Sequence, residues 1–166
     1  MQVKRGQKGE PVARVEQRIP APVERVFDIL ADGWSYSSWV VGASHIRRVD
    51  SGWPQPGSRI HHSIGPWPLV VKDVTLVEEL ERRRRLVLRA RLWPFGAATV
   101  RFDLTSAGAE ATTVVMDEEL KEGPFGLLPA RVQAALLVPR NRETLLRLSD
   151  LATRPTGDAT PNGTGA

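Results

Sequence analysis

The sequence of 166 residues contains no cysteine. This absence excludes disulfide bonds, thiol nucleophiles, zinc–thiolate centres and iron–sulfur clusters, and it is typical of a cytoplasmic protein. No stretch approaches 18 consecutive uncharged apolar residues, so the sequence predicts no stable insertion into a membrane. The first ten residues, MQVKRGQKGE, are polar and basic without an apolar centre, so we expect no secretory signal there.

The motifs of several common enzyme classes are also missing. The sequence has no GxGxxG after a strand, no GxxxxGK[ST] phosphate loop, no GxSxG and no HExxH. Dinucleotide binding, nucleotide-phosphate binding and the usual hydrolase chemistries therefore have no support from a motif. We expect the protein to use no cofactor.

The charge is modest and unevenly distributed. The formal net charge is +4, and the N-terminal tail holds +2 of it, from Lys4, Arg5 and Lys8 minus Glu10. The basic run Arg82–Arg85 lies beside three glutamates, which is typical of a solvated turn between strands. Aromatic residues interleaved with basic ones, as single-strand binders have, are not evident. The sequence therefore predicts no nucleic-acid partner.

The part of the chain between residues 11 and 152 has the pattern of a strand, two short helices, about six strands and a long helix. Val12–Ile19 alternates between apolar and polar residues and predicts the first strand. Pro22–Leu30 has apolar residues at helical spacing after a proline that suits a first turn. Asp32 is a candidate N-cap for a second short helix that ends at Trp39.

Alternation and turn residues predict the later strands. They are expected at Ser44–Asp50, Gly57–Ile64, Leu69–Leu80, Arg85–Trp93, 98–104 and Ala111–Glu122. The connections are short, so neighbouring strands should be antiparallel. Residues 1–10 are expected to form a flexible basic tail, and residues 153–166, which are rich in Pro, Gly and Thr, a disordered one.

The long helix is predicted at Pro129–Ala152. Its apolar seam has three- and four-residue spacing and consists of Ala134, Leu137, Val138, Leu145, Leu148 and Ala152. Pro139 lies inside the helix, where it should produce a kink. Asn141 lies on the seam and needs a partner, which is a ligand, a water molecule or a backbone carbonyl freed by Pro139. Such a helix must lie on the concave face of a curved sheet, with a cavity between them.

This order of elements resembles the START-like, or SRPBCC, superfamily, in its polyketide cyclase/dehydrase-like branch. The opening I-x-A-P-x-x-x-V-F of that branch is matched by Ile19, Ala21, Pro22, Val26 and Phe27, and its later tryptophan by Trp39. The long strand with its charged turn, LVVKDVTLVEELERRRRLVLRA, and the late helix with NRETLLRL are also similar. The resemblance covers residues 11–152. It implies an α+β, helix-grip (Bet v 1-like) fold, in which about seven antiparallel strands surround the C-terminal helix and a deep cavity.

The three histidines do not predict a metal site. His61 and His62 are adjacent on a predicted strand, so their side chains point to opposite faces and cannot bind one metal ion together. The only other histidine is His45. One of the adjacent pair can face the cavity as an acid/base group. The alternative is an exposed or hydrogen-bonded strand histidine without a catalytic role.

Two carboxylates are further catalytic candidates. Glu118 lies on the otherwise apolar face of Val114, Met116 and Leu120, where it would be partly desolvated and suited to acid/base chemistry. Alternatively, it lies near the strand end and reaches solvent. Asp73 shares a face with valine and threonine residues, and the same two interpretations apply to it.

The candidates for ligand contact are mostly apolar or aromatic residues, with Trp67 expected on a loop at the pocket mouth and Asn141 on the helix seam. We expect the ligand to meet Trp39, Trp67, Leu88, Phe102, Met116, Leu137 and Asn141. Packing in the core or in loops is the alternative role for each tryptophan.

Three functions remain open at this point. The first is binding of a hydrophobic, lipid- or polyketide-like small molecule between the sheet and the C-terminal helix. The second is a polyketide cyclase or dehydratase that uses a carboxylate or histidine in the pocket. The third is a protein-interaction module with a collapsed cavity and an exposed apolar patch. The superfamily includes all of these, so the fold alone does not decide among them. The protein is expected to be a monomer or a homodimer.

Overall fold

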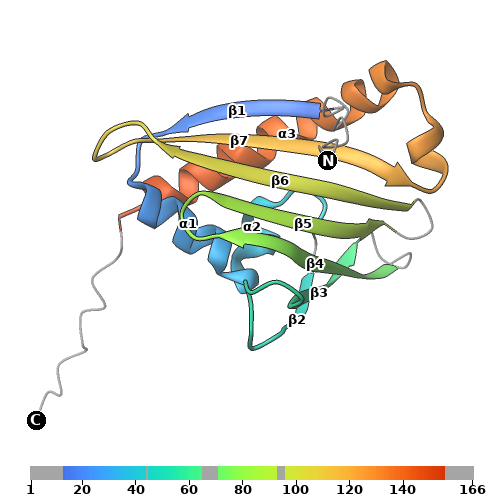
Figure 1. Cartoon of the computed structure of the whole chain (residues 1–166), viewed down its shortest axis with the longest axis horizontal. Coiled ribbons are helices and arrows are strands. Elements are labelled where there is room, and N and C mark those ends of the chain that lie inside the picture. Colours follow the sequence, from blue (N-terminus) through green and yellow to red (C-terminus); the bar gives the residue numbers. More distant parts are fainter. Residues whose placement is uncertain (1–12, 44, 65–70, 93–95, 156–166) are drawn as a thin grey trace, which may run out of the picture.

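The computed structural model describes residues 13–43, 45–64, 71–92 and 96–155. The strands are β1 (Ala13–Ile19), β2 (His45–Val49), β3 (Arg59–Ile64), β4 (Val71–Glu81), β5 (Arg85–Leu92), β6 (Gly96–Ser106) and β7 (Thr112–Glu122). The helices are α1 (Val23–Ala31), α2 (Tyr36–Trp39) and α3 (Ala130–Thr153), with short 3-10 segments η1 (Gly33–Ser35) and η2 (Pro124–Leu127). Figure 1 shows their arrangement.

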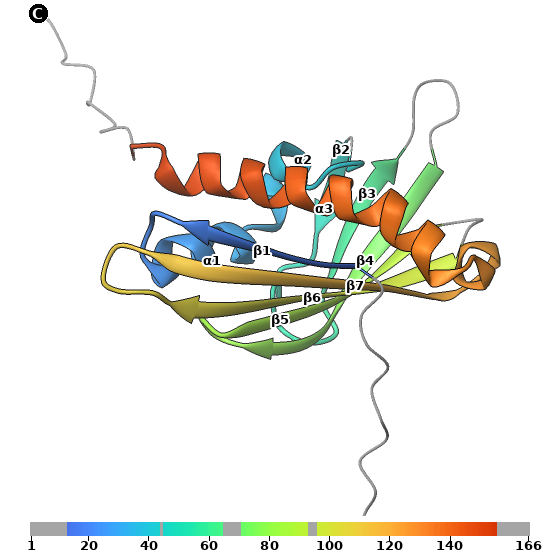
Figure 2. The same cartoon turned by 90° about the horizontal axis from the view of Figure 1, so that it is seen from above.

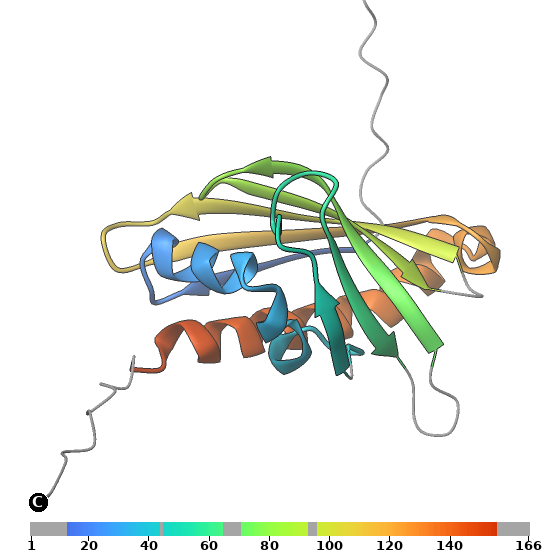
Figure 3. The ribbon, with the colours of Figure 1, turned by 90° about the horizontal axis from the view of Figure 1, so that it is seen from below.

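The seven strands form one antiparallel sheet in the order β1-β7-β6-β5-β4-β3-β2. Pairing of β1 with β7 brings the start of the domain beside its last strand. Register shifts interrupt the ladder between Val77 and Glu79 on β4 and between Ala97 and Ala98 on β6. Such irregularities bend strands. The sheet is curved, and α3 lies along its concave side together with α1 and α2 (Figures 2 and 3).

The predicted α+β, helix-grip architecture is confirmed, and most element ends agree within two residues. The strand predicted from Gly57 begins two residues later, at Arg59, because Gly57 has φ +89 and lies in the turn before β3. The strand β6 begins two residues earlier than predicted, at Gly96 rather than at residue 98. A Cβ at Gly96 would lie 1.6 Å from the carbonyl oxygen of Glu122, so only glycine permits this pairing with β7. Both terminal tails lie almost entirely outside the described residues.

The short helices begin as the sequence predicts. The carboxylate of Asp32 accepts a hydrogen bond from the backbone N–H of Trp34 (3.0 Å), which caps η1. Pro22 stands immediately before α1, where its missing N–H leaves no helical hydrogen bond unmade. These local features bring Tyr36 and Trp39 to the concave side of the sheet.

The helix α3 continues without interruption through Pro139. The backbone N–H groups of Val132 and Gln133 both donate to the carbonyl of Pro129, so the helix starts where the proline predicts. Leu137, Leu145, Leu148 and Ala152 of the seam are buried, and Asn141 is fully buried. The kink at Pro139 stays a prediction. Among the described residues, no helix combines the length and the apolar composition needed to cross a membrane.

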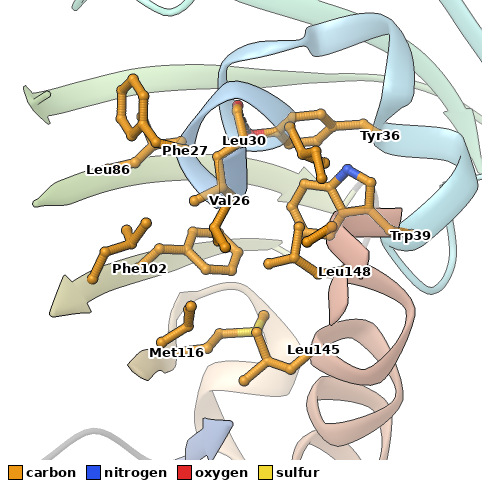
Figure 4. Close-up of a cluster of buried hydrophobic side chains, with 14 of the residues drawn as sticks. Val26, Phe27, Leu30, Tyr36, Trp39, Leu86, Phe102, Met116, Leu145 and Leu148 are labelled. Atoms are coloured by element: carbon orange, nitrogen blue, oxygen red, sulfur yellow. Dashed lines mark hydrogen bonds between the residues drawn. The ribbon is translucent and has the colours of Figure 1, made fainter. Parts of the chain in front are cut away.

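The core joins the sheet, the short helices and the C-terminal half of α3. Figure 4 shows Val26, Phe27, Leu30, Tyr36, Trp39, Leu86, Phe102, Met116, Leu145 and Leu148 packed together. The rings of Trp39 and Phe102 meet edge to face with centroids 5.9 Å apart. The hydroxyl of Tyr36 donates to the carbonyl of Leu30 (3.0 Å). Burial, assisted by the charge of Asp32, raises the pKa of this phenol, so it remains a donor.

Candidate ligand-binding site

A cavity of about 120 Å³ lies between the concave face of the sheet and α3. Inward-facing side chains from six strands form its wall, and they are Ile46, Ile60, His62, Thr75, Leu88, Ala90, Val100, Phe102, Met116 and Glu118. Tyr36 and residues 40–43 close one side, and Arg140 and Thr144 of α3 form the roof. Most of this surface is apolar, with a few polar groups.

The strand register explains why these side chains converge. Val100 on β6 is directly opposite Glu118 on β7, and Phe102 is opposite Met116. Directly opposed residues of an antiparallel pair project from the same face. Residues two apart on one strand share that face as well, so alternate positions of β4 to β7 all point toward α3.

The cavity meets the surface between α3 and the segment 40–43. Val40, Val41 and Ala43 are half-buried, and Gly42 is exposed. The backbone N–H of Val41 donates to the hydroxyl of the buried Thr144 (3.2 Å). One hydrogen bond therefore ties this segment to the helix at the mouth of the cavity.

An ion pair between β7 and α3 stands inside the cavity. The side chain of Glu118 is 2% exposed, and Nη2 of Arg140 lies 2.5 Å from both of its carboxylate oxygens. The same Nη2 also donates to Oδ1 of Asn141 (3.3 Å). Among the described residues, the buried Nε of Arg140 and Nδ2 of Asn141 have no hydrogen-bond partner. The pair places one negative and one positive charge against an otherwise apolar wall.

His62 is a further titratable group of the cavity wall. Its Nε2 lies 2.9 Å from the hydroxyl of Thr75, and both residues are buried. Burial lowers the pKa of His62, and the nearby charge of Asp73 only partly offsets this effect. The imidazole is therefore neutral at pH 7, with one N–H donor and one acceptor nitrogen. Its Nδ1 is buried without a partner among the described residues.

The structure separates the four catalytic candidates. Glu118 and His62 both line the cavity. His61 points to the other face, as adjacent strand positions require, and its Nε2 lies 3.3 Å from Oδ1 of Asp50. Asp73 is buried and directly opposite His62, but it is not part of the cavity wall. It accepts a hydrogen bond from the backbone N–H of Val74 (2.8 Å).

The candidates for ligand contact divide in the same way. Leu88, Phe102 and Met116 form part of the wall. Trp39, Leu137 and Asn141 are not among the residues that line it, and their contact with a ligand stays a prediction. Trp39 fills the core beside Phe102, because α2 directs it under the C-terminal half of α3. Leu137 and Asn141 are buried on α3, which packs most extensively against β1. Trp67 lies outside the described residues.

Sequence reasoning missed the residues that α3 contributes. Arg140 and Thr144 form the roof, yet the predicted seam contains neither of them. Their spacing carried a usable signal, because Arg140 follows Leu137 by three positions and precedes Thr144 by four, as residues on one helix face do. Thr75, which is hydrogen-bonded to His62, could have been found in the same way, because it lies two positions from Asp73 on the same face of the predicted strand.

Within the described residues, no group of three His, Asp or Glu side chains is placed to hold a metal ion. The polar groups of the cavity are instead suited to hydrogen bonding and to proton transfer. A neutral imidazole can accept or donate a proton, and a guanidinium can donate hydrogen bonds to an oxygen of a ligand. The apolar surface around them suits a hydrophobic partner.

Comparison with known proteins agrees with this arrangement. The sequence model of the family described as polyketide cyclase / dehydrase and lipid transport matches residues 11–153. No curated protein sequence matches the chain. The crystal structure of DynU16, a protein from the dynemicin biosynthetic locus, is 25% identical with a TM-score of 0.59. That match covers 83% of this chain and 45% of DynU16, so the chain spans less than half the length of that relative.

Two more distant structures share the fold over more than nine tenths of their length. The Zhui aromatase/cyclase from Streptomyces sp. R1128 is 17% identical with a TM-score of 0.67, over 89% of this chain and 96% of that protein. A START superfamily protein from Mycobacterium smegmatis is 14% identical with a TM-score of 0.59, over 84% and 92%. These likenesses concern the fold alone.

Proposed function

Because the chain belongs to the polyketide cyclase / dehydrase and lipid transport family, we propose that it binds a hydrophobic small molecule, lipid- or polyketide-like, in the cavity under α3. The observation that carries this proposal is the mostly apolar wall of that cavity, formed by six strands and covered by α3. Transfer of apolar ligand surface from water to such a wall contributes roughly 25 cal/mol per Å².

The size of the cavity limits the ligand. A volume of about 120 Å³ is below the roughly 300–1,000 Å³ of pockets that enclose drug-sized ligands. It is closer to an apolar cavity of about 150 Å³ that binds benzene. One ring or a short chain therefore fits inside, and a longer ligand extends through the mouth past residues 40–43. Displacement of that segment from α3 involves loss of the hydrogen bond from Val41 to Thr144.

Titration with toluene, followed by ¹H–¹⁵N NMR, tests this proposal. Toluene should shift the amide signals of Leu88, Val100 and Met116, which belong to the cavity wall. Ala90→Leu places a larger side chain in the cavity and should abolish these shifts. Ala135→Leu makes the same substitution on the exposed surface of α3 and should leave them unchanged. Binding that is absent from the wild type, or equal in Ala90→Leu, would rule out the proposal.

A second candidate function is dehydration or cyclisation of a polyketide-like substrate. Its support is that His62 and Glu118 both line the cavity. In a dehydration, a neutral His62 would accept the proton from the carbon beside a ketone and pass it to the hydroxyl, which leaves as water while a conjugated double bond forms. His62→Asn should then abolish loss of water from a β-hydroxyketone without affecting toluene binding. Equal turnover in the variant and the wild type would exclude this role.

The interaction-module alternative is less well supported by the geometry. It predicts a collapsed interior, whereas the cavity is open. Exposed apolar side chains do occur near the start of α3, at Leu127, Val132 and Leu136. They are separate from the cavity and do not account for its polar groups.

A further inference from the structure

We infer that the cavity selects an uncharged ligand that carries a hydrogen-bond-accepting oxygen, such as a ketone or a phenol, and discriminates against carboxylates. This inference rests on the proposed function, because it names the chemical class that the same cavity accepts. It follows from the charges that the described part of the cavity wall contains.

The charges of the wall already cancel. Glu118 and Arg140 are the only residues with a formal charge among its described members, and they pair with each other at 2.5 Å. His62 is neutral and hydrogen-bonded to Thr75. A ligand that enters this space therefore meets a dipole rather than a net positive charge.

A carboxylate would meet unfavourable electrostatics in this cavity. Arg140 is the one cation of the described wall, and it already forms an ion pair with Glu118, whose side chain is 2% exposed. A second carboxylate would have to share that guanidinium, which leaves two negative charges and one positive charge against apolar surface. Like charges in one site oppose each other, and the lost hydration of the ligand carboxylate would not be replaced.

An uncharged oxygen meets no such penalty. A guanidinium has five N–H donors, and the bonds of Arg140 to Glu118 and Asn141 all use Nη2. Its Nε–H has no acceptor among the described residues. Because Arg140 lines the cavity, this unpartnered donor favours a ligand that supplies an acceptor there. A ketone or phenol oxygen does so without altering the net charge.

A neighbouring ion pair provides the matched control. Asp117, the residue before Glu118, points to the opposite face of β7 and pairs with Arg101 (2.5 Å) and Arg14 (3.1 Å). Its side chain is nearly as buried, at 6% exposed. Asp117→Asn therefore removes a carboxylate from a similar ion pair outside the cavity, whereas Glu118→Gln removes one inside it.

The test compares three probes of nearly equal size by NMR titration of the full chain at pH 7. Acetophenone carries a ketone, benzoate carries a carboxylate in its place, and toluene carries neither. In the wild type, acetophenone should bind at least tenfold more tightly than benzoate. Glu118→Gln leaves Arg140 without its anion, so benzoate should bind at least tenfold more tightly than it binds the wild type, and the preference for acetophenone should be lost. Asp117→Asn should keep the wild-type preference.

The outcomes separate the two proposals. If none of the probes binds the wild type, both the proposed function and this inference fail. If toluene binds while benzoate equals or exceeds acetophenone, only the inference fails. If Glu118→Gln folds, as judged by circular dichroism, and keeps the wild-type preference, the inference also fails. Should that variant not fold, the comparison of acetophenone with benzoate in the wild type alone decides.

Discussion

The two halves of α3 cover the same sheet in different ways. The C-terminal half presses Leu145 and Leu148 into the large side chains of Trp39 and Phe102, and this end is filled (Figure 4). Toward its middle, α3 stands above the cavity with Arg140 and Thr144. The filled end is apolar, whereas the hollow end combines apolar residues with polar or charged groups.

This difference shows how one small domain maintains both a core and a binding cavity. Dense packing at one end supplies stability through apolar burial. The other end encloses the cavity, and its polar groups are held by specific partners. A substitution should therefore affect stability at the filled end and ligand selection at the hollow end.

The same leucine-to-alanine change at the two ends should show the difference in packing most clearly. Leu148 is fully buried at the filled end, and Leu148→Ala should lower the free energy of unfolding by about 4 kcal/mol. Leu88 is also buried, but it borders the cavity and has fewer packing partners to lose, so Leu88→Ala should cost about 2 kcal/mol. Urea denaturation measures both values. Equal losses would show that the two ends are packed alike.

The ion pair of the hollow end should contribute more to the stability of the fold than an exposed ion pair on the same helix. Arg140→Ala leaves the carboxylate of Glu118 buried without its cation, and the expected loss of stability is about 3 kcal/mol. Arg147→Ala removes an exposed pair with Glu143, and the loss should be below about 0.5 kcal/mol. Urea midpoints of the two variants provide the measurement. A small effect at Arg140 would mean that Glu118 finds another partner.

The buried histidine should make stability dependent on pH. The pKa of His62 is lower in the folded than in the unfolded protein, so below about pH 6.5 the unfolded state binds the proton more readily. The contribution of His62 is therefore complete above that pH and is lost as the pH falls through the folded pKa, by at most about 1.4 kcal/mol per pH unit. Unfolding measured at several pH values should show this slope.

Two variants test whether His62 causes this pH dependence. His62→Asn should remove its contribution from the pH dependence of the unfolding free energy. His61→Asn leaves His62 in place and should retain it, because His61 points to the opposite face beside Asp50. If His62→Asn has the same pH profile as the wild type, another group is responsible for the dependence.

The smallest effect is expected at the mouth of the cavity. Thr144→Val has nearly the same shape but cannot accept the hydrogen bond from the backbone N–H of Val41, so it should destabilise the protein by about 1 kcal/mol. Hydrogen exchange at the Val41 amide should become faster. Exchange in the core around Leu148 should change only as far as the lower free energy of global unfolding requires. An unchanged rate at Val41 would show that the bond does not hold the segment 40–43.

Local sequence patterns determined the elements and their faces. Alternation predicted that Leu88, Phe102 and Met116 point inward, because successive side chains of a strand project to opposite sides. The same rule placed His61 and His62 on different faces, and prolines marked the starts of α1 and α3. These features depend on residues close in the chain, so they can be derived from the sequence.

Only the tertiary structure decided which inward-facing residues border the cavity. Glu118 and Arg140 are 22 positions apart, and they meet because the curved sheet places β7 under the middle of α3. The same curvature leaves Asp73 outside the wall and buries Trp39 in the core. Periodicity assigns a side chain to a face, but the distance between two faces depends on sheet curvature and on where the helix crosses it, and neither is a local property of the sequence.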